Sequence, residues 1–100
     1  MKIQRNNLIF CFPKYNTNSE ILAIANSSPL YTKLRNDIKK NGIINPLLVE
    51  DLKNGKYKVW VGNMRLAAAQ ILKIKELECV IITDTSPKAL KAKKKELFII

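Results

Sequence analysis

Apolar residues recur at helical spacing through residues 29–41, with polar and charged residues between them. Ser28 suits the position before a helix, because its side chain can accept a hydrogen bond from a free amide, and Pro29 fits the first helical position. Gly42 follows as a C-terminal stop. The pattern therefore predicts an amphipathic helix over residues 29–41, with Leu30 on its buried face.

Short apolar runs that are rich in β-branched and aromatic residues predict the strands. The first expected strand covers residues 8–12. Residues 46–49 and 56–61 flank Asn54-Gly55, a pair that favours a type I′ hairpin turn with two positive-φ residues. Another strand is expected over residues 77–83.

Two further helices are expected. After Gly62 the apolar residues return to helical spacing, with Met64 among them, which predicts a helix over residues 63–72 that starts directly from a strand. A lysine-rich stretch predicts a helix over residues 87–97. The order of strand, helix, hairpin, helix, strand and helix indicates a small α/β (α+β) fold with a mixed sheet, and residues 1–100 are expected to form a single domain.

The composition excludes several classes of active site. The chain has 18 Lys and Arg against 8 Asp and Glu, a net charge of +10, no histidine and 2 cysteines. Without an imidazole, Ser-His-Asp and Cys-His sites are excluded, and two thiols cannot form the usual zinc site, so no metal site is expected. We expect Cys11 and Cys79 to be buried, reduced thiols in the cytoplasm, with one disulfide as the alternative. No apolar window reaches the ~18 residues of a membrane span.

The excess positive charge favours a polyanionic partner, because lysine and arginine neutralise phosphates and release counterions. In the expected C-terminal helix a stripe of lysines could follow a DNA backbone; it consists of Lys88, Lys91, Lys94 and Lys95. A solvated lysine face explains the same pattern, and both interpretations stay open. The apolar residues 97–100 are expected to be buried as a final strand or in a homodimer interface.

One candidate binding segment is the turn where a strand passes directly into a helix. It consists of Gly62, Asn63, Met64 and Arg65. Helix N-termini bind anions, a glycine lets a phosphate approach the backbone, and Arg65 is expected to bind that phosphate rather than to hold the fold together. The structural alternative is a turn glycine followed by an arginine that pairs with Glu50 or Asp51.

A second candidate segment joins the first long helix to the hairpin and reads Gly42-Ile43-Ile44-Asn45-Pro46. Gly42 as a helix stop and Pro46 as a strand start explain this segment structurally. As a binding segment, it would offer Asn45 to hydrogen-bond a base or a sugar.

In order and spacing, the two segments resemble those of the ParB/sulfiredoxin-like superfamily, and of the ParB N-terminal domain in particular, over residues 30–84. Gly42 and Pro46 match a Gly-x-x-x-Pro segment, while Gly62 and Arg65 match a Gly-Glu-Arg-Arg-like phosphate motif. The resemblance implies that both segments bind a nucleoside triphosphate with Mg²⁺. That nucleotide is CTP in the chromosome-partition proteins and ATP in sulfiredoxins, and some relatives phosphorylate free serine.

Three departures limit what the resemblance implies. Met64 replaces the first arginine of the phosphate motif, and Asn63 stands where sulfiredoxins have their catalytic cysteine, so sulfiredoxin activity is not expected. No helix-turn-helix region can follow residue 87, so sequence-specific operator binding is not expected either. Hydrolysis of the nucleotide or phosphoryl transfer stays open, and no catalytic residue can be named.

The sequence thus predicts a stand-alone ParB-like domain that binds CTP, ATP or another phosphate compound at these two segments, in the nucleic-acid context of a phage or mobile element. The alternative is a non-catalytic, non-specific DNA-binding or nuclease-like accessory module that uses the lysine stripe. A third interpretation is a domain with an empty pocket that contacts other proteins.

Overall fold

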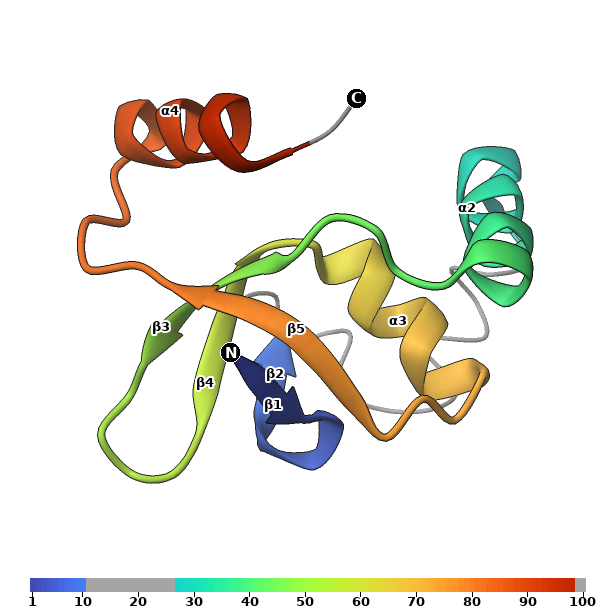
Figure 1. Cartoon of the computed structure of the whole chain (residues 1–100), viewed down its shortest axis with the longest axis horizontal. Helices are drawn as coiled ribbons and strands as arrows, with labels where there is room; N and C mark the ends of the chain where they lie inside the picture. The colour runs from blue at the N-terminus through green and yellow to red at the C-terminus, as the bar shows by residue number, and fades with distance from the viewer. Residues whose placement is uncertain (11–26, 99–100) are drawn as a thin grey trace.

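A mixed five-stranded sheet forms the centre of the computed structural model, which describes residues 1–10 and 27–98 (Figure 1). Along the sheet the strands lie in the order β1-β5-β3-β4-β2. Their bounds are Lys2–Gln4 for β1, Leu8–Phe10 for β2, Leu47–Asp51 for β3, Tyr57–Val61 for β4 and Glu76–Ile81 for β5. The β3–β4 and β1–β5 pairs are antiparallel, whereas β3–β5 and β2–β4 are parallel. The expected α/β fold with a mixed sheet is confirmed.

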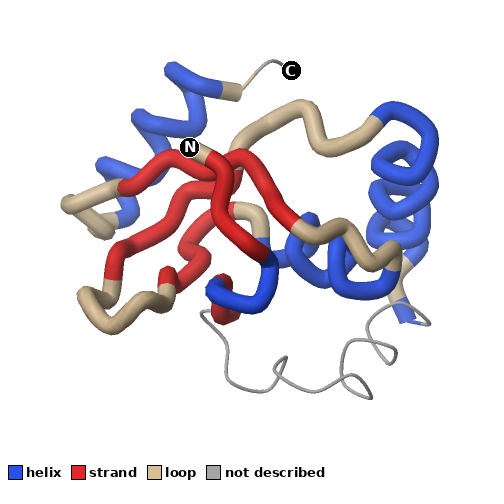
Figure 2. The backbone as a smooth tube through the Cα atoms, turned by 60° about the horizontal axis from the view of Figure 1, so that its bottom comes forward, coloured by secondary structure: helices blue, strands red, loops and turns tan. Residues whose placement is uncertain are grey.

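The described part of the chain has three α-helices, α2 (Pro29–Asn41), α3 (Asn63–Ile71) and α4 (Pro87–Leu97), and one 3-10 turn, η1 (Arg5–Asn7). Helix α2 has the predicted bounds, because both of its end signals operate: the Ser28 hydroxyl accepts the Tyr31 amide at 3.2 Å, and Gly42 ends the helix at a φ of 77°. Helices α2 and α3 lie on one side of the molecule, and α4 stands apart beyond the end of β5 (Figure 2).

The core lies between the sheet and the two helices α2 and α3. Its fully buried large side chains are Tyr31, Leu47, Val49, Val59, Leu66 and Cys79, whereas the equally buried Leu48 points to the other face of β3. Helix α3 buries four consecutive residues, Leu66 to Ala69, because the sheet covers one of its sides and α2 packs on another. The expected buried faces were partly wrong: Leu30 is 75% exposed, with Tyr31 buried in its place, and Met64 is 43% exposed.

The hairpin between β3 and β4 is confirmed, but its predicted turn type is wrong. Residues 52–56 connect the strands, and the positive φ angles fall at Lys53 (62°) and Gly55 (84°) rather than at Asn54. The reason lies in local side-chain acceptors. Asp51 accepts the Lys53 amide at 2.8 Å and Asn54 accepts the Lys56 amide at 3.0 Å, which favours a longer loop than a two-residue turn.

Several expectations concern the chain ends. Strand β1 was not predicted; it pairs with β5 through a register that joins Ile3 to Leu77. Positions 11 and 12 of the predicted first strand lie outside the described residues, as does Cys11, whereas Cys79 is a free, buried thiol. Phe98 follows α4 in extended backbone, and its ring packs on the guanidinium of Arg65. Positions 99 and 100 of the predicted buried end lie outside the described residues. Among the described residues, no helix has the length and apolar character needed to cross a membrane.

Candidate functional site

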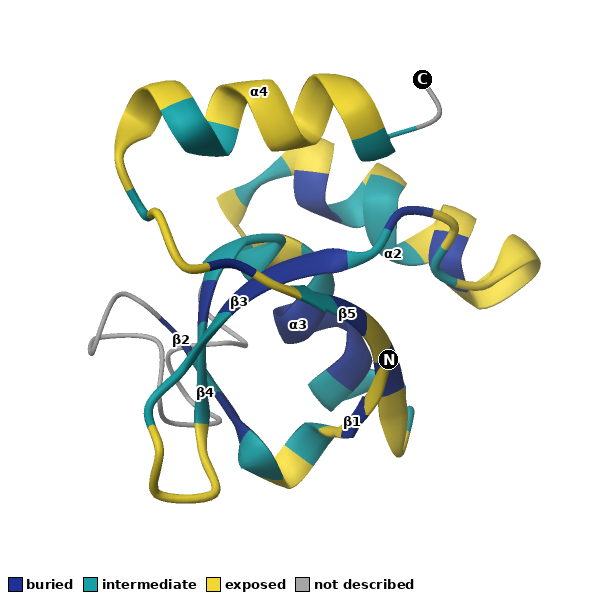
Figure 3. Cartoon of the chain, turned by 60° about the vertical axis from the view of Figure 1, so that its left-hand side comes forward, coloured by how far each residue is buried: buried dark blue, intermediate teal, exposed yellow. Residues whose placement is uncertain are grey.

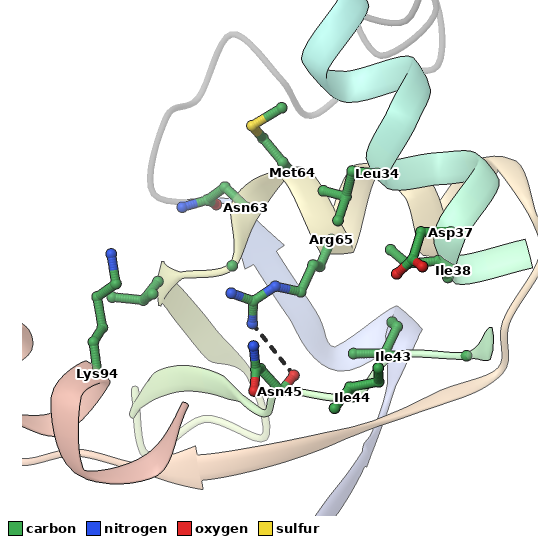
Figure 4. Close-up of a pocket in the computed structure, with 13 residues that line it drawn as sticks. Leu34, Asp37, Ile38, Ile43, Ile44, Asn45, Asn63, Met64, Arg65 and Lys94 are labelled. Atoms are coloured by element: carbon green, nitrogen blue, oxygen red, sulfur yellow. Dashed lines mark hydrogen bonds between the residues drawn. The ribbon is translucent and has the colours of Figure 1, made fainter. Parts of the chain in front are cut away.

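A cavity of about 520 Å³ lies between α2, the segment 42–46, the first turn of α3 and the end of α4 (Figure 4). It brings together most of the residues of the two candidate segments. Those lining it are Gly42, Asn45, Gly62, Asn63, Met64 and Arg65. Pro46 does not line the cavity, but its carbonyl holds Arg65 there. Two segments that are separated in the sequence by the whole β3–β4 hairpin therefore meet at one cavity.

The first turn of α3 borders this cavity, and its N-cap residue is a glycine, which has no side chain to cap the helix. Gly62 occupies the N-cap position at a φ of 106°, and its carbonyl accepts the first helical hydrogen bond, from Leu66, at 2.9 Å. The Asn63 side chain turns back to donate to the Val59 carbonyl at 3.0 Å. A helix N-terminus carries a positive partial charge, so this end of α3 is suited to hold an anion.

Gly62 is required by the core as well as by the turn. A Cβ at this position would lie 2.8 Å from Cγ of the fully buried Leu47, a contact too short for two carbon atoms. The added methyl group would also meet Nη1 of Arg65 at 3.5 Å. Gly62 is therefore needed chiefly because the turn packs closely against Leu47 of strand β3.

Arg65 links the two candidate segments directly. Its Nη1 donates to the carbonyls of Asn45 at 3.3 Å and Pro46 at 3.1 Å, and its guanidinium stacks 4.6 Å from the centroid of the Phe98 ring. Partial burial lowers the pKa of Arg65 from its usual value, yet an arginine stays charged at neutral pH. The expectation that Arg65 holds no part of the fold is therefore wrong.

The alternative that Arg65 pairs with a carboxylate of β3 is also wrong. Glu50 accepts a hydrogen bond from Nε1 of Trp60 at 2.9 Å, and neither residue lines the cavity. Asp51 lies 3.7 Å from the ammonium of Lys53. Among the described residues, the recorded partners of the guanidinium are backbone carbonyls and an aromatic ring.

The four lysines of the predicted stripe on α4 have different surroundings in the structure. Lys94 lines the cavity, with its ammonium 6.0 Å from the Phe98 ring, whereas Lys88, Lys91 and Lys95 do not line it. Helix α4 has no buried residue within its bounds and presents its surface to solvent (Figure 3). One of the lysines that were expected to follow a DNA backbone therefore also lines the cavity, together with Arg65.

Sequence reasoning missed the wall that α2 contributes, which consists of Leu34 and Ile38 with the carboxylate of Asp37 beside it. Ile43 and Ile44 of the second candidate segment extend this apolar wall. Leu34 and Ile38 lie about two turns and one turn before Gly42, but apolar residues there are equally expected in a core. Among the described residues, no three acidic or thiol side chains form a group that could hold a metal ion.

Comparison with known proteins agrees with this architecture. The family model of the ParB N-terminal domain matches residues 27–96. Among solved structures, the chain is similar to the C-terminally truncated chromosome-partitioning protein ParB from Caulobacter crescentus complexed with CTP-gamma-S, with a TM-score of 0.67 and 18% identity. That match covers 96% of this chain and 51% of the other, so the chain spans about half the length of that ParB structure.

Two other structures share the fold. SbnI with a C-terminal truncation, from Staphylococcus aureus, has a TM-score of 0.61 and 21% identity, over 85% of this chain and 31% of that one. Sulfiredoxin from Arabidopsis thaliana has a TM-score of 0.58 and 18% identity, over 92% of each chain. No curated protein is significantly similar in sequence. Because the family model covers most of the sequence and the fold agrees, the chain belongs to the ParB N-terminal domain family.

Proposed function

We propose that the chain binds a nucleoside triphosphate in the cavity, with the phosphates at the first turn of α3 and the nucleoside toward α2. One observation supports this above all: the N-terminus of α3, which has a glycine at its N-cap, and two cationic side chains, Arg65 and Lys94, line the same end of one cavity. Among the described residues of the lining, the carboxylate of Asp37 lies on the α2 side, away from Lys94. The three positive features therefore repel one another, and a polyphosphate would remove that repulsion.

The donors at this end suit a polyphosphate. Among the described residues, the two carbonyl bonds of Arg65 engage Nη1 alone, so the rest of its five-donor fork can reach a phosphate. Lys94 approaches from a different element, α4, and supplies a second cation. A cavity of about 520 Å³ lies in the range of sites for small ligands, about 300–1,000 Å³.

The family supports a nucleotide as the ligand, since one ParB with the same fold has been solved with CTP-gamma-S. Mg²⁺ would be held by the phosphate oxygens and water, as it commonly is beside triphosphates. This chain supplies binding and orientation, and we assign no group to bond breaking.

The test is ligand-induced stabilisation against heat with CTP, ATP, GTP and ADP, each with and without Mg²⁺. A ligand at 100 times its Kd should stabilise the protein by about 2.7 kcal/mol. Lys94→Gln should weaken binding about tenfold, because a charge-assisted contact is lost. Lys95→Gln is the matched control, since Lys95 neighbours Lys94 on α4 but does not line the cavity. Stabilisation by none of the four nucleotides, or equal effects of the two variants, would refute the proposal.

A second function has its own support, because α4 presents Lys88, Lys91 and Lys95 to solvent and clear of the cavity. We propose that this surface binds duplex DNA without sequence preference. The logarithm of the affinity should fall linearly with the logarithm of salt concentration, and replacing the three lysines by Gln should reduce that slope by about one per lost phosphate contact. An unchanged slope would exclude this surface.

A further inference from the structure

The cavity has two chemically different ends. Arg65, Lys94 and the N-terminus of α3 form the cationic end, whereas Asp37 of α2 is the acidic side chain of the lining. Asp37 lies with Ile38 and Ile43 on the α2 side, away from Lys94 (Figure 4). The sequence pattern around Asp37 predicts no role for this residue, and the binding of phosphates leaves it without one.

The carboxylate of Asp37 is partly oriented by its own helix. Its Oδ1 accepts a hydrogen bond from the Asn41 side-chain amide at 2.9 Å, one turn further along α2. Among the described residues, Asp37 forms no ion pair, so Oδ2 keeps its capacity to accept. An ionised carboxylate can only accept hydrogen bonds, and it repels phosphate.

A ligand group beside the exposed carboxylate of Asp37 should therefore be a hydrogen-bond donor rather than a phosphate. The neighbouring wall of Leu34, Ile38 and Ile44 is apolar, which suits the flat face of a base. In a nucleotide two kinds of neutral donor lie away from the phosphates, namely the ribose hydroxyls and the exocyclic amino group of a base.

We propose that Asp37 is a specificity-determining residue, which accepts a hydrogen bond from a neutral donor of the nucleoside and so fixes the ligand's direction in the cavity. This inference rests on the proposed nucleotide site, and it states which nucleotides that site should prefer. Nucleotides that lack the donor should bind more weakly, because the carboxylate would then lose its water without gaining a partner.

The experiment compares three nucleotides by titration calorimetry in the presence of Mg²⁺. They are the nucleotide that binds best, its 2′-deoxy form and the analogue without the exocyclic amino group, which is UTP for CTP and ITP for ATP or GTP. Each is measured with the unmodified protein and with Asp37→Asn. Glu76→Gln is the matched control, because it removes one exposed negative charge outside the cavity lining.

The unmodified protein should prefer the full nucleotide about tenfold over one of the two analogues, and Asp37→Asn should reduce that ratio to about threefold or less. A change confined to the deoxy comparison identifies the ribose as the donor, and a change confined to the amino comparison identifies the base. A similar change in all three affinities would mean that Asp37 acts through its charge or on Mg²⁺, and would overturn the inference while the nucleotide site stands. Absence of any nucleotide binding would overturn both.

Discussion

Replacing Gly62 with alanine should destabilise the fold before it affects any ligand. Gly62 has a φ of 106°, in the left-handed region where a Cβ is unfavourable. In addition, the new methyl group would stand 2.8 Å from Cγ of Leu47. Leu47 is fully buried between the sheet and the helices, so its side chain cannot move aside without displacing other core residues.

The size of the effect follows from these two contributions. The left-handed conformation costs a residue with a Cβ about 1–2 kcal/mol, and overpacking of a core costs about 1–3 kcal/mol. The free energy of unfolding should therefore fall by about 2–5 kcal/mol, a large part of the roughly 5–15 kcal/mol that stabilises a typical domain.

Gly55→Ala provides the control, because Gly55 has a φ of 84° but no atom within 4 Å of its virtual Cβ. This variant isolates the conformational contribution, and should cost about 1–2 kcal/mol. Equilibrium unfolding in urea can be followed through the fluorescence of the single tryptophan, Trp60, and both variants should keep the same dependence on urea concentration. If Gly62→Ala costs no more than Gly55→Ala, the contact with Leu47 is not what requires the glycine.

Two further predictions concern the cavity and the core. Arg65→Ala should lower the free energy of unfolding by about 1–3 kcal/mol without any ligand, because two charge-assisted hydrogen bonds to the carbonyls of Asn45 and Pro46 are lost. If this variant unfolds at the same urea concentration as the unmodified protein, these hydrogen bonds do not stabilise the fold. Burial raises the pKa of Cys79 to about 11, above its value in the unfolded chain. The thiol should therefore leave the free energy of unfolding unchanged below about pH 8.5. Between about pH 8.5 and 11 that free energy should fall, because the unfolded chain loses the thiol proton while the folded protein keeps it. Cys79→Ala should remove that part of the pH dependence, and identical pH profiles for the two proteins would refute it.

The parts of the fold that the sequence predicted well are those with local signals. Helix α2 begins and ends where expected, because Ser28, Pro29 and Gly42 act through neighbouring backbone groups. The buried face of that helix was less predictable, since Leu30 and Tyr31 are adjacent and only the position of α3 decides which is covered. Strand order and β1 depend on pairing between distant segments, for which the sequence holds no local signal.

The candidate site shows the same division. The segments around Gly42 and Gly62 could be found because each has a backbone requirement that marks it in the sequence. Asp37 and Lys94 could not be assigned to the cavity, because their role depends on how α2 and α4 are placed around α3. The hydrogen bonds from Arg65 to the carbonyls of Asn45 and Pro46 could not be predicted either, because every residue has a backbone carbonyl and the sequence does not mark which of them accept.

The arrangement of β1 and β2 has a consequence for how the protein is made. Only η1 separates the two strands in the chain, yet they occupy opposite edges of the sheet, and the first of them pairs with β5 some 70 residues later. At ribosomal rates of about 5–20 residues per second, β1 waits about 4–15 s before its partner has been synthesised. The segment that holds β1 and β2 thus completes both edges of the sheet only after β4 and β5 have been synthesised, so a nascent chain that ends before β5 lacks the β1–β5 pair.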